Sequence, residues 1–87
     1  MNTTLLLMAQ YGRAVVPLED VRRDYFGHLS VAVFARRAAA GDLPLPVMRI
    51  GEGNKAGRGV HVQDMAAYLD QQREAARREF EQINGRP

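Results

Sequence analysis

Two segments with a helical spacing of apolar residues, 17–26 and 31–40, are separated by only four residues in the sequence. A short connection that contains a glycine is typical of two helices in a helix-turn-helix arrangement. Ser30 is a favoured N-cap residue and stands directly before the second segment. The sequence therefore predicts a helix-turn-helix over residues 17–41, and the remaining segments have to be arranged around it.

A glycine-rich, basic stretch, GEGNKAGRG at residues 51–59, lies between two strand-like runs that follow this pair. The prolines of the preceding LPLP sequence exclude a central strand but allow an edge strand. We therefore expect a β-hairpin over residues 46–62, with the glycine-rich stretch as its tip, and a long helix over residues 63–84. A hairpin in this place is the wing of a winged helix. The predicted fold is mainly α with a small β-hairpin, a winged helix-turn-helix with an extended C-terminal helix.

The N-terminal segment, residues 1–16, precedes the helix-turn-helix. We expect a short helix in NTTLLLMAQYG, with a threonine cap and an end at Gly12. An extended stretch should follow, because the residue before Pro17 is pushed out of helical space. With 87 residues the chain forms a single domain, residues 1–87, with one small core.

Positive charge is concentrated in the middle third of the chain, although the net charge is only +2. Residues 30–61 hold five basic residues against two acidic ones, and 11 of the 12 basic residues of the chain are arginine. Arginine presents a planar fork of donors that suits phosphates and guanine edges. The alanines of the second helix would let it approach a groove closely. We therefore interpret the second helix and the hairpin as a surface for double-stranded DNA.

The candidate DNA-contacting residues fall into three groups. They are Ser30, Arg36 and Arg37 on the recognition helix, Arg49, Asn54, Lys55 and Arg58 on the wing, and, as weaker candidates for the DNA backbone, Arg22 and Arg23. The side chains expected to face the core from the recognition helix are those of Val31, Phe34, Ala35 and Ala38. In the alternative interpretation these arginines are merely solvated, Arg22 and Arg23 pair with neighbouring carboxylates, and the glycine-rich stretch is an ordinary exposed loop.

The sequence gives little support to other classes of function. The absence of cysteine excludes disulfides and thiolate metal sites. We expect His28 in a turn and His61 facing solvent on a strand, and neither has further ligands at metal-binding spacing. No nucleophile stands beside a base and no phosphate-loop pattern is present, so we expect no enzyme, no catalytic residues, no metal and no cofactor. No apolar run approaches the roughly 18 residues of a membrane span, and we expect no membrane contact.

The last predicted helix is long for so small a domain. Twenty helical residues span about 30 Å. The second half of this helix is mostly polar, yet Ala76, Phe80 and Ile83 form an apolar stripe along it. A stripe that projects past the core favours a homodimer or higher homo-oligomer, through this helix, the N-terminal segment or both. Alternatively, the stripe folds back over residues 5–8 of the same chain.

Two resemblances add to this interpretation. The order of segments is similar to that of small winged helices of the excisionase/MerR-like type, which carry a G-(D/E)-x-P-x-P step into the wing, here GDLPLP at residues 41–46. More closely, almost the whole chain resembles the pyocin activator protein family, through LLLMAQYG, VPLEDVRRDYF, GDLPLP and KAGRGVHVQDMAAYLD.

The second resemblance implies a function. Members of that family activate the transcription of bacteriocin genes after DNA damage and bind DNA boxes near promoters. It therefore implies a bacterial activator of pyocin-like or prophage genes, cytoplasmic and associated with the nucleoid, with RNA polymerase as a further partner. Two other functions stay open: an excisionase-like factor that bends DNA, and a protein-interaction module that does not bind DNA.

Overall fold

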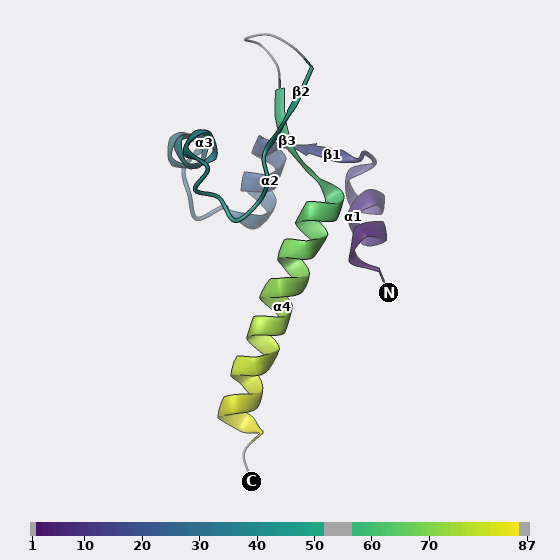
Figure 1. Cartoon of the computed structure of the whole chain (residues 1–87), viewed down its shortest axis with the longest axis vertical. Coiled ribbons are helices and arrows are strands. Elements are labelled where there is room, and N and C mark those ends of the chain that lie inside the picture. Colours follow the sequence, from purple (N-terminus) through teal and green to yellow (C-terminus); the bar gives the residue numbers. More distant parts are fainter. Residues whose placement is uncertain (1, 52–56, 86–87) are drawn as a thin grey trace.

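The described residues of the computed structural model, 2–51 and 57–85, form a helical domain with a small sheet (Figure 1). In chain order the elements are α1 (Thr3–Tyr11), β1 (Val15–Pro17), α2 (Leu18–Tyr25), α3 (Val31–Ala40), β2 (Met48–Ile50), β3 (Gly57–His61) and α4 (Val62–Asn84). The predicted class is confirmed: the chain is mainly helical, with a hairpin of β2 and β3 and an extended C-terminal helix, as in a winged helix.

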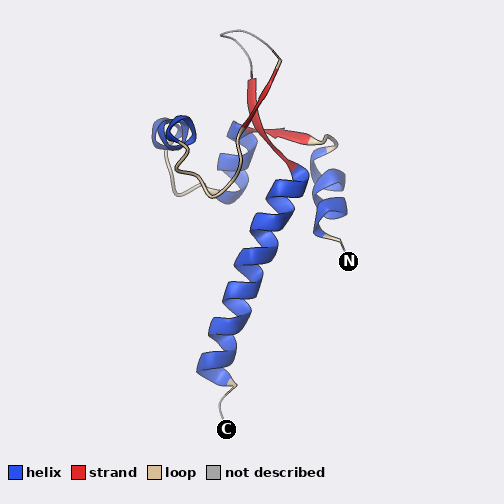
Figure 2. Ribbon diagram, viewed as in Figure 1, coloured by secondary structure: helices blue, strands red, loops and turns tan. Residues whose placement is uncertain are grey.

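The sheet has three antiparallel strands in the order β1-β3-β2 (Figure 2). The extended stretch before α2 was predicted, but its pairing with β3 was not. Gly59 lies at the centre, opposite Pro17 of β1 and Met48 of β2. A Cβ atom on Gly59 would stand 2.6 Å from the carbonyl oxygen of Val16. The absence of a side chain at Gly59 therefore allows β1 to pair closely with β3.

The two helices of the helix-turn-helix begin and end close to the predicted positions. Pro17 was predicted to be the first residue of the helix. It is instead the last residue of β1 and the N-cap of α2, which begins at Leu18. The Ser30 hydroxyl caps α3 by accepting a hydrogen bond from the backbone N–H of Val33 at 3.2 Å. Gly41 ends α3 with a φ of 74°, in the left-handed region that glycine adopts most easily.

The buried face of α3 is narrower than predicted. Phe34 and Ala38, one helical turn apart, are buried, whereas Ala35 is exposed and Val31 is 60% exposed. The expectation that Val31 and Ala35 face the core was therefore wrong. The reason is that α3 lies at the edge of the domain and packs through a single row of side chains, with the Phe34 ring 5.4 Å from the ring of Phe26.

The core lies between the sheet, α2 and the first half of α4. Its members come from every helix and from two of the strands: Leu7, Val16, Val21, Phe26, Phe34, Leu45, Val60, Val62, Met65 and Ala66. Val62, predicted to close the hairpin, is instead the first residue of α4. His61 was expected to face solvent but is half-buried, and its Nδ1 atom caps α4 by accepting a hydrogen bond from the N–H of Gln63 at 3.0 Å.

Helix α1 is present as predicted and packs beside the first half of α4. Asn2 rather than a threonine caps it. One bond joins it to α4, from Thr3 Oγ1 to Asp70 Oδ1 at 2.7 Å, and a second holds the loop after it, from the Val62 N–H to the carbonyl of Ala14 at 2.8 Å. Leu7 is buried, but Leu5, Leu6 and Met8 remain exposed. The apolar run of α1 is thus only partly covered within the chain.

Candidate nucleic-acid interface

Two arginines stand directly opposite each other on the hairpin. Arg49 of β2 is the cross-strand partner of Arg58 of β3. Directly opposite residues of an antiparallel pair project from the same face of the sheet with Cβ atoms about 5 Å apart, and like charges in such a pair destabilise it. This arrangement concentrates two guanidinium groups on one face, where an anion between them would remove the repulsion.

Neither arginine of this pair is neutralised by the residues that the structure describes. Ion pairs involve Arg22, Arg23 and Arg77, at distances of 2.7 to 3.1 Å, and none involves Arg49 or Arg58. The two strands themselves carry no acidic residue. The pair is therefore an uncompensated double positive charge over the described part of the hairpin, with Arg49 exposed and Arg58 half-buried.

The predicted recognition residues on α3 are also exposed and without ion pairs to described residues. Arg36 and Arg37 follow the buried Phe34, and Arg36 lies two residues from both Phe34 and Ala38, on the opposite side of the helix. The residues beside them on the outer face, Ala32, Ala35 and Ala39, are small and exposed. An outer face with short side chains and two long cationic ones can enter a groove closely.

Ser30 has a structural role in addition to its predicted one. Its oxygen accepts the capping bond from Val33, so that lone pair is occupied. A hydroxyl also has a proton to donate, and Ser30 is exposed at the N-terminus of α3. A phosphate oxygen could accept that proton while the helix dipole attracts the negative charge.

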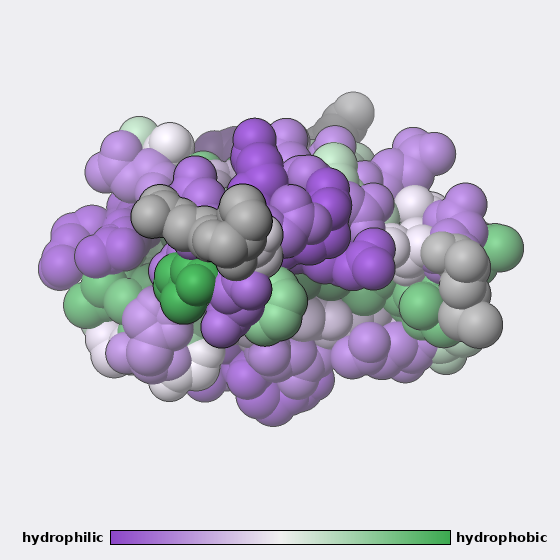
Figure 3. All heavy atoms as spheres, turned by 90° about the horizontal axis from the view of Figure 1, so that it is seen from below, coloured by the Kyte–Doolittle hydropathy of each residue, from purple (hydrophilic) through white to green (hydrophobic). Residues whose placement is uncertain are grey.

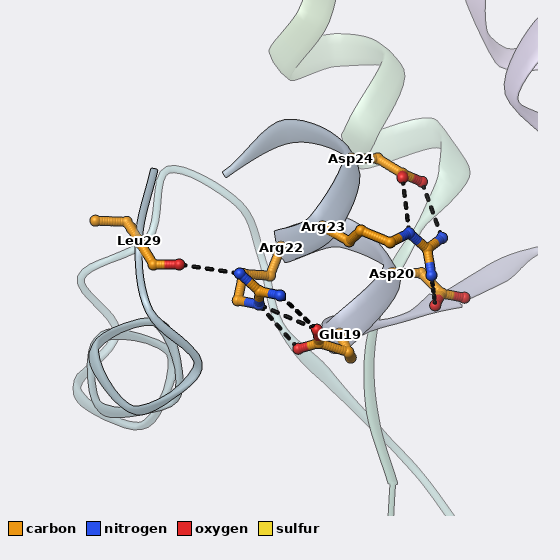
Figure 4. A network of polar contacts seen from close by, with 6 residues as sticks. All are labelled: Glu19, Asp20, Arg22, Arg23, Asp24 and Leu29. Carbon is orange, nitrogen blue, oxygen red and sulfur yellow. Dashed lines mark hydrogen bonds and ion pairs between the residues drawn. The ribbon is translucent and has the colours of Figure 1, made fainter. Parts of the chain in front are cut away.

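Arg22 of α2 contacts carboxylate and backbone groups of its own chain (Figure 4). Its guanidinium holds Glu19 in a two-pronged bond, with the shortest distance 2.7 Å, and donates to the carbonyl of Leu29 at 3.0 Å. The hydrogen bond from Arg22 lowers the pKa of Glu19. Arg22 thus connects α2 to the turn before α3, which is a positioning role that sequence reasoning missed.

Arg23 is engaged in the same way on the other side of α2. It donates to Asp20 at 3.1 Å and to Asp24 at 3.0 Å. Asp24 also accepts from the Tyr11 hydroxyl at 2.6 Å, and the bonds from Arg23 and then Tyr11 lower the pKa of Asp24. The carboxylates around Arg22 and Arg23 offset their charge, which favours the alternative interpretation of these two residues.

The described members of the two main groups come from α3 and from the hairpin of β2 and β3. In Figure 1, α3 and the hairpin lie on the side away from α1 and from the C-terminal end of α4. Asn54 and Lys55, predicted for the wing, lie outside the described residues. The described arginines of α3 and the hairpin, here called the arginine face, are Arg36, Arg37, Arg49 and Arg58, and none of them forms an ion pair with a described residue.

Other kinds of site find no support in the described part of the chain. No cluster there has three side chains able to hold a metal ion, and no charged or polar residue is buried. A shallow apolar hollow, lined in part by Phe26, Tyr68 and Leu69, encloses no space for even a water molecule and so offers no ligand site. Among the described helices, none combines the length and apolar composition that crossing a membrane requires.

Comparison with known proteins gives one match. Residues 3–76 match the family model described as pyocin activator protein PrtN. Neither the curated proteins nor the solved structures gave a match. The matched range begins with α1, includes the helix-turn-helix and the hairpin, and continues into α4, so it covers most of the chain. The protein belongs to the pyocin activator protein family.

Proposed function

We propose that this protein activates pyocin-like genes by binding double-stranded DNA with sequence preference. The family is one of transcription activators rather than of enzymes. In the proposal α3 enters the major groove, while the hairpin contacts the phosphate backbone or the adjacent minor groove. A protein acting in this way would be found with the bacterial nucleoid.

The Arg49–Arg58 pair carries the proposal. A cross-strand pair of like charges costs stability in the free protein, and no described carboxylate offsets it. A guanidinium group binds a phosphate through two parallel N–H···O bonds, so each arginine of the pair can hold a phosphate. The repulsion would therefore be relieved when the hairpin lies along a DNA backbone.

The arginines of α3 and the Arg49–Arg58 pair do not all have the same role in the proposal. Phosphate contacts fix the position of a protein on the duplex, whereas base contacts discriminate between sequences. Arg36, on the outermost side of α3, is the residue we assign to a guanine edge, where a two-pronged contact contributes about 1–3 kcal/mol of discrimination. Arg37 and Ser30, nearer the domain, are assigned to the backbone.

The size of the electrostatic effect follows from the number of contacts. Each phosphate neutralised contributes about −0.9 to the slope of log K against log salt concentration. The three arginines assigned to phosphates, Arg37, Arg49 and Arg58, give a slope of about −2.7, so that affinity falls about fortyfold between 50 and 200 mM salt. An interaction module with solvated arginines would show no such dependence.

The test compares Arg49→Ala/Arg58→Ala with the matched control Arg13→Ala/Arg78→Ala. The control also removes two exposed arginines without ion pairs to described residues, from the loop before β1 and from α4. Binding to promoter and unrelated duplexes is measured by fluorescence anisotropy over a range of salt. We expect the hairpin variant to bind every duplex more weakly, with a slope shallower by about 1.8, and the control to behave as wild type.

A third variant tests the assignment of sequence preference. Arg36→Ala should lose between about 5- and 150-fold of the preference for promoter over unrelated DNA, while keeping binding to unrelated duplexes. Equal losses in the hairpin variant and its control would contradict the proposed DNA surface. An undiminished preference in Arg36→Ala would contradict only the base contact.

A further inference from the structure

The apolar stripe of α4 is longer than the domain that it packs against. Residues at alternating steps of four and three run the whole length of the helix: Val62, Ala66, Leu69, Arg73, Ala76, Phe80 and Ile83. The first two are buried in the core and Leu69 packs partly against it. From Asp70 to the end every described residue is exposed, Phe80 at 64% and Ile83 at 70%.

The shape of the chain agrees with an uncovered helix. The radius of gyration is 15.3 Å, whereas a compact domain of this length has one of about 12 Å. The longest dimension is 58 Å and the shortest 17 Å. Figure 3, which views the molecule from the end of α4, shows apolar surface beside the C-terminal end among hydrophilic residues. The second half of α4 therefore lacks the packing that normally stabilises an amphipathic helix.

We propose that the exposed half of α4 pairs with the same segment of a second copy of this chain, in an antiparallel coiled coil. The steps of four and three define a heptad repeat in which Leu69, Ala76 and Ile83 take position d and Arg73 and Phe80 position a. This proposal concerns the free protein and is independent of DNA binding.

The charge balance of the exposed half of α4 favours a second copy of this chain over a highly charged partner. Residues 71–84 hold three arginines and three glutamates, so the segment is neutral overall. A polyanion such as DNA would gain little from it. Two neutral copies with an apolar stripe do not repel each other, and each copy can cover the Phe80 and Ile83 side chains of the other.

The position of Arg73 selects the antiparallel orientation. In a parallel, in-register pair each a position faces its own copy, and Arg73 would meet the Arg73 of the other chain. In an antiparallel pair a positions face d positions, so that Arg73 lies opposite Ala76, whose small side chain leaves space for it. The same register places Phe80 opposite Leu69, at the edge of the apolar hollow.

The flanking positions point to the same orientation. Asp70 and Arg77 both take position e, and e positions of antiparallel helices lie beside each other, which forms two symmetric pairs of opposite charge. Asp70 accepts only one described bond, from Thr3. Arg77 uses three of its five N–H groups on Glu74 and Glu81. In a parallel pair Arg77 would lie beside Gln72, and the charge complementarity would be lost.

The first experiment measures mass in solution by sedimentation equilibrium, from about 1 to 100 µM, for the full chain without DNA. Phe80→Glu/Ile83→Glu is compared with Gln71→Glu/Gln82→Glu, which adds the same two charges on the outer side of the helix. We expect wild type and the control to dimerise and the stripe variant to have a dissociation constant raised at least about tenfold. A monomeric wild type at about 100 µM, or equal effects of both variants, would overturn the proposal.

The second experiment determines orientation. Since the chain has no cysteine, Gln82→Cys provides a unique site for a spin label, and the distance between the two labels is measured by pulsed electron paramagnetic resonance. In the proposed register the two labels are offset by about 15 residues, or about 22 Å along the axis. A parallel dimer would bring them to the same level, and a distance well below about 20 Å would refute the antiparallel arrangement.

Discussion

Gly59 of β3 offers a sharp test of how the sheet is held together. Replacing it with alanine adds a Cβ atom 2.6 Å from the Val16 carbonyl oxygen and 2.7 Å from Val15 Cγ1. Ordinary van der Waals contacts are near 3.5–4 Å. The nearest obstacle is backbone, which cannot rotate aside as a side chain can. We expect β1 to be displaced from β3 in the Gly59→Ala protein.

The cost can be worked from these distances. Overpacking a closed site costs about 1–3 kcal/mol, and replacing glycine returns up to about 1 kcal/mol by restricting the unfolded chain. A net loss of about 1–2 kcal/mol lowers the melting temperature of a domain of this size by about 5–15 °C.

Gly57 of the same strand is the matched control. A Cβ atom there would meet nothing within 4 Å, so Gly57→Ala should raise the melting temperature by a few degrees, through the unfolded chain alone. Thermal unfolding followed by far-ultraviolet circular dichroism gives both values. Similar melting temperatures for the two variants would show that close packing of β1 on Gly59 does not determine stability.

Two further predictions concern the packing of the core and the loss of stability at low pH. Phe34→Ala removes a buried ring packed on Phe26 and should cost about 3–5 kcal/mol in urea unfolding, whereas Val31→Ala, at an exposed site, should cost under about 0.5 kcal/mol. The hydrogen bonds from Arg23 and then Tyr11 lower the pKa of Asp24 in the folded state. The ionised Asp24 carboxylate therefore stabilises the folded protein above its unfolded pKa of about 4, and this stabilisation is lost as the pH falls through the folded pKa. NMR titration should show Arg23→Ala raising the pKa of Asp24 more than Tyr11→Phe does, and the opposite order would contradict that ranking of causes.

The parts of the fold that could be predicted are those with local signals. Ser30 and Gly41 mark the ends of α3 because capping depends on a few neighbouring residues. The pairing of β1 with β3 joins residues more than 40 positions apart, and no local pattern encodes it. The exposure of Val31 and Ala35 could not be predicted for the same reason. Helical periodicity shows which side of α3 faces the core, but not how wide a strip of that side the rest of the domain covers.

The candidate site was predictable in composition but not in arrangement. Arg36 and Arg37 could be found because a helix with alanines and two arginines lacks apolar residues on its outer side. The pairing of Arg49 with Arg58 depends on the register of the hairpin, which the hydrophobic pattern leaves loosely defined in so short a pair of strands. Arg22 could not be assigned from sequence, because its acceptor Leu29 becomes a neighbour only when the helix-turn-helix closes.

The two proposals together predict the form of the DNA site. A two-fold symmetric dimer presents two copies of α3 related by that axis, so a sequence-specific dimer should select an inverted repeat whose half-sites lie on a common face of the duplex. Six phosphate-contacting arginines, three on each arginine face, would also double the salt slope, to about −5.4. Selection from a random duplex library should therefore return inverted repeats with wild type and single half-sites, at a slope near −2.7, with Phe80→Glu/Ile83→Glu. Inverted repeats selected equally by both proteins would mean that symmetry arises on the DNA rather than through α4, and selection of no sequence by either would count against base recognition by α3.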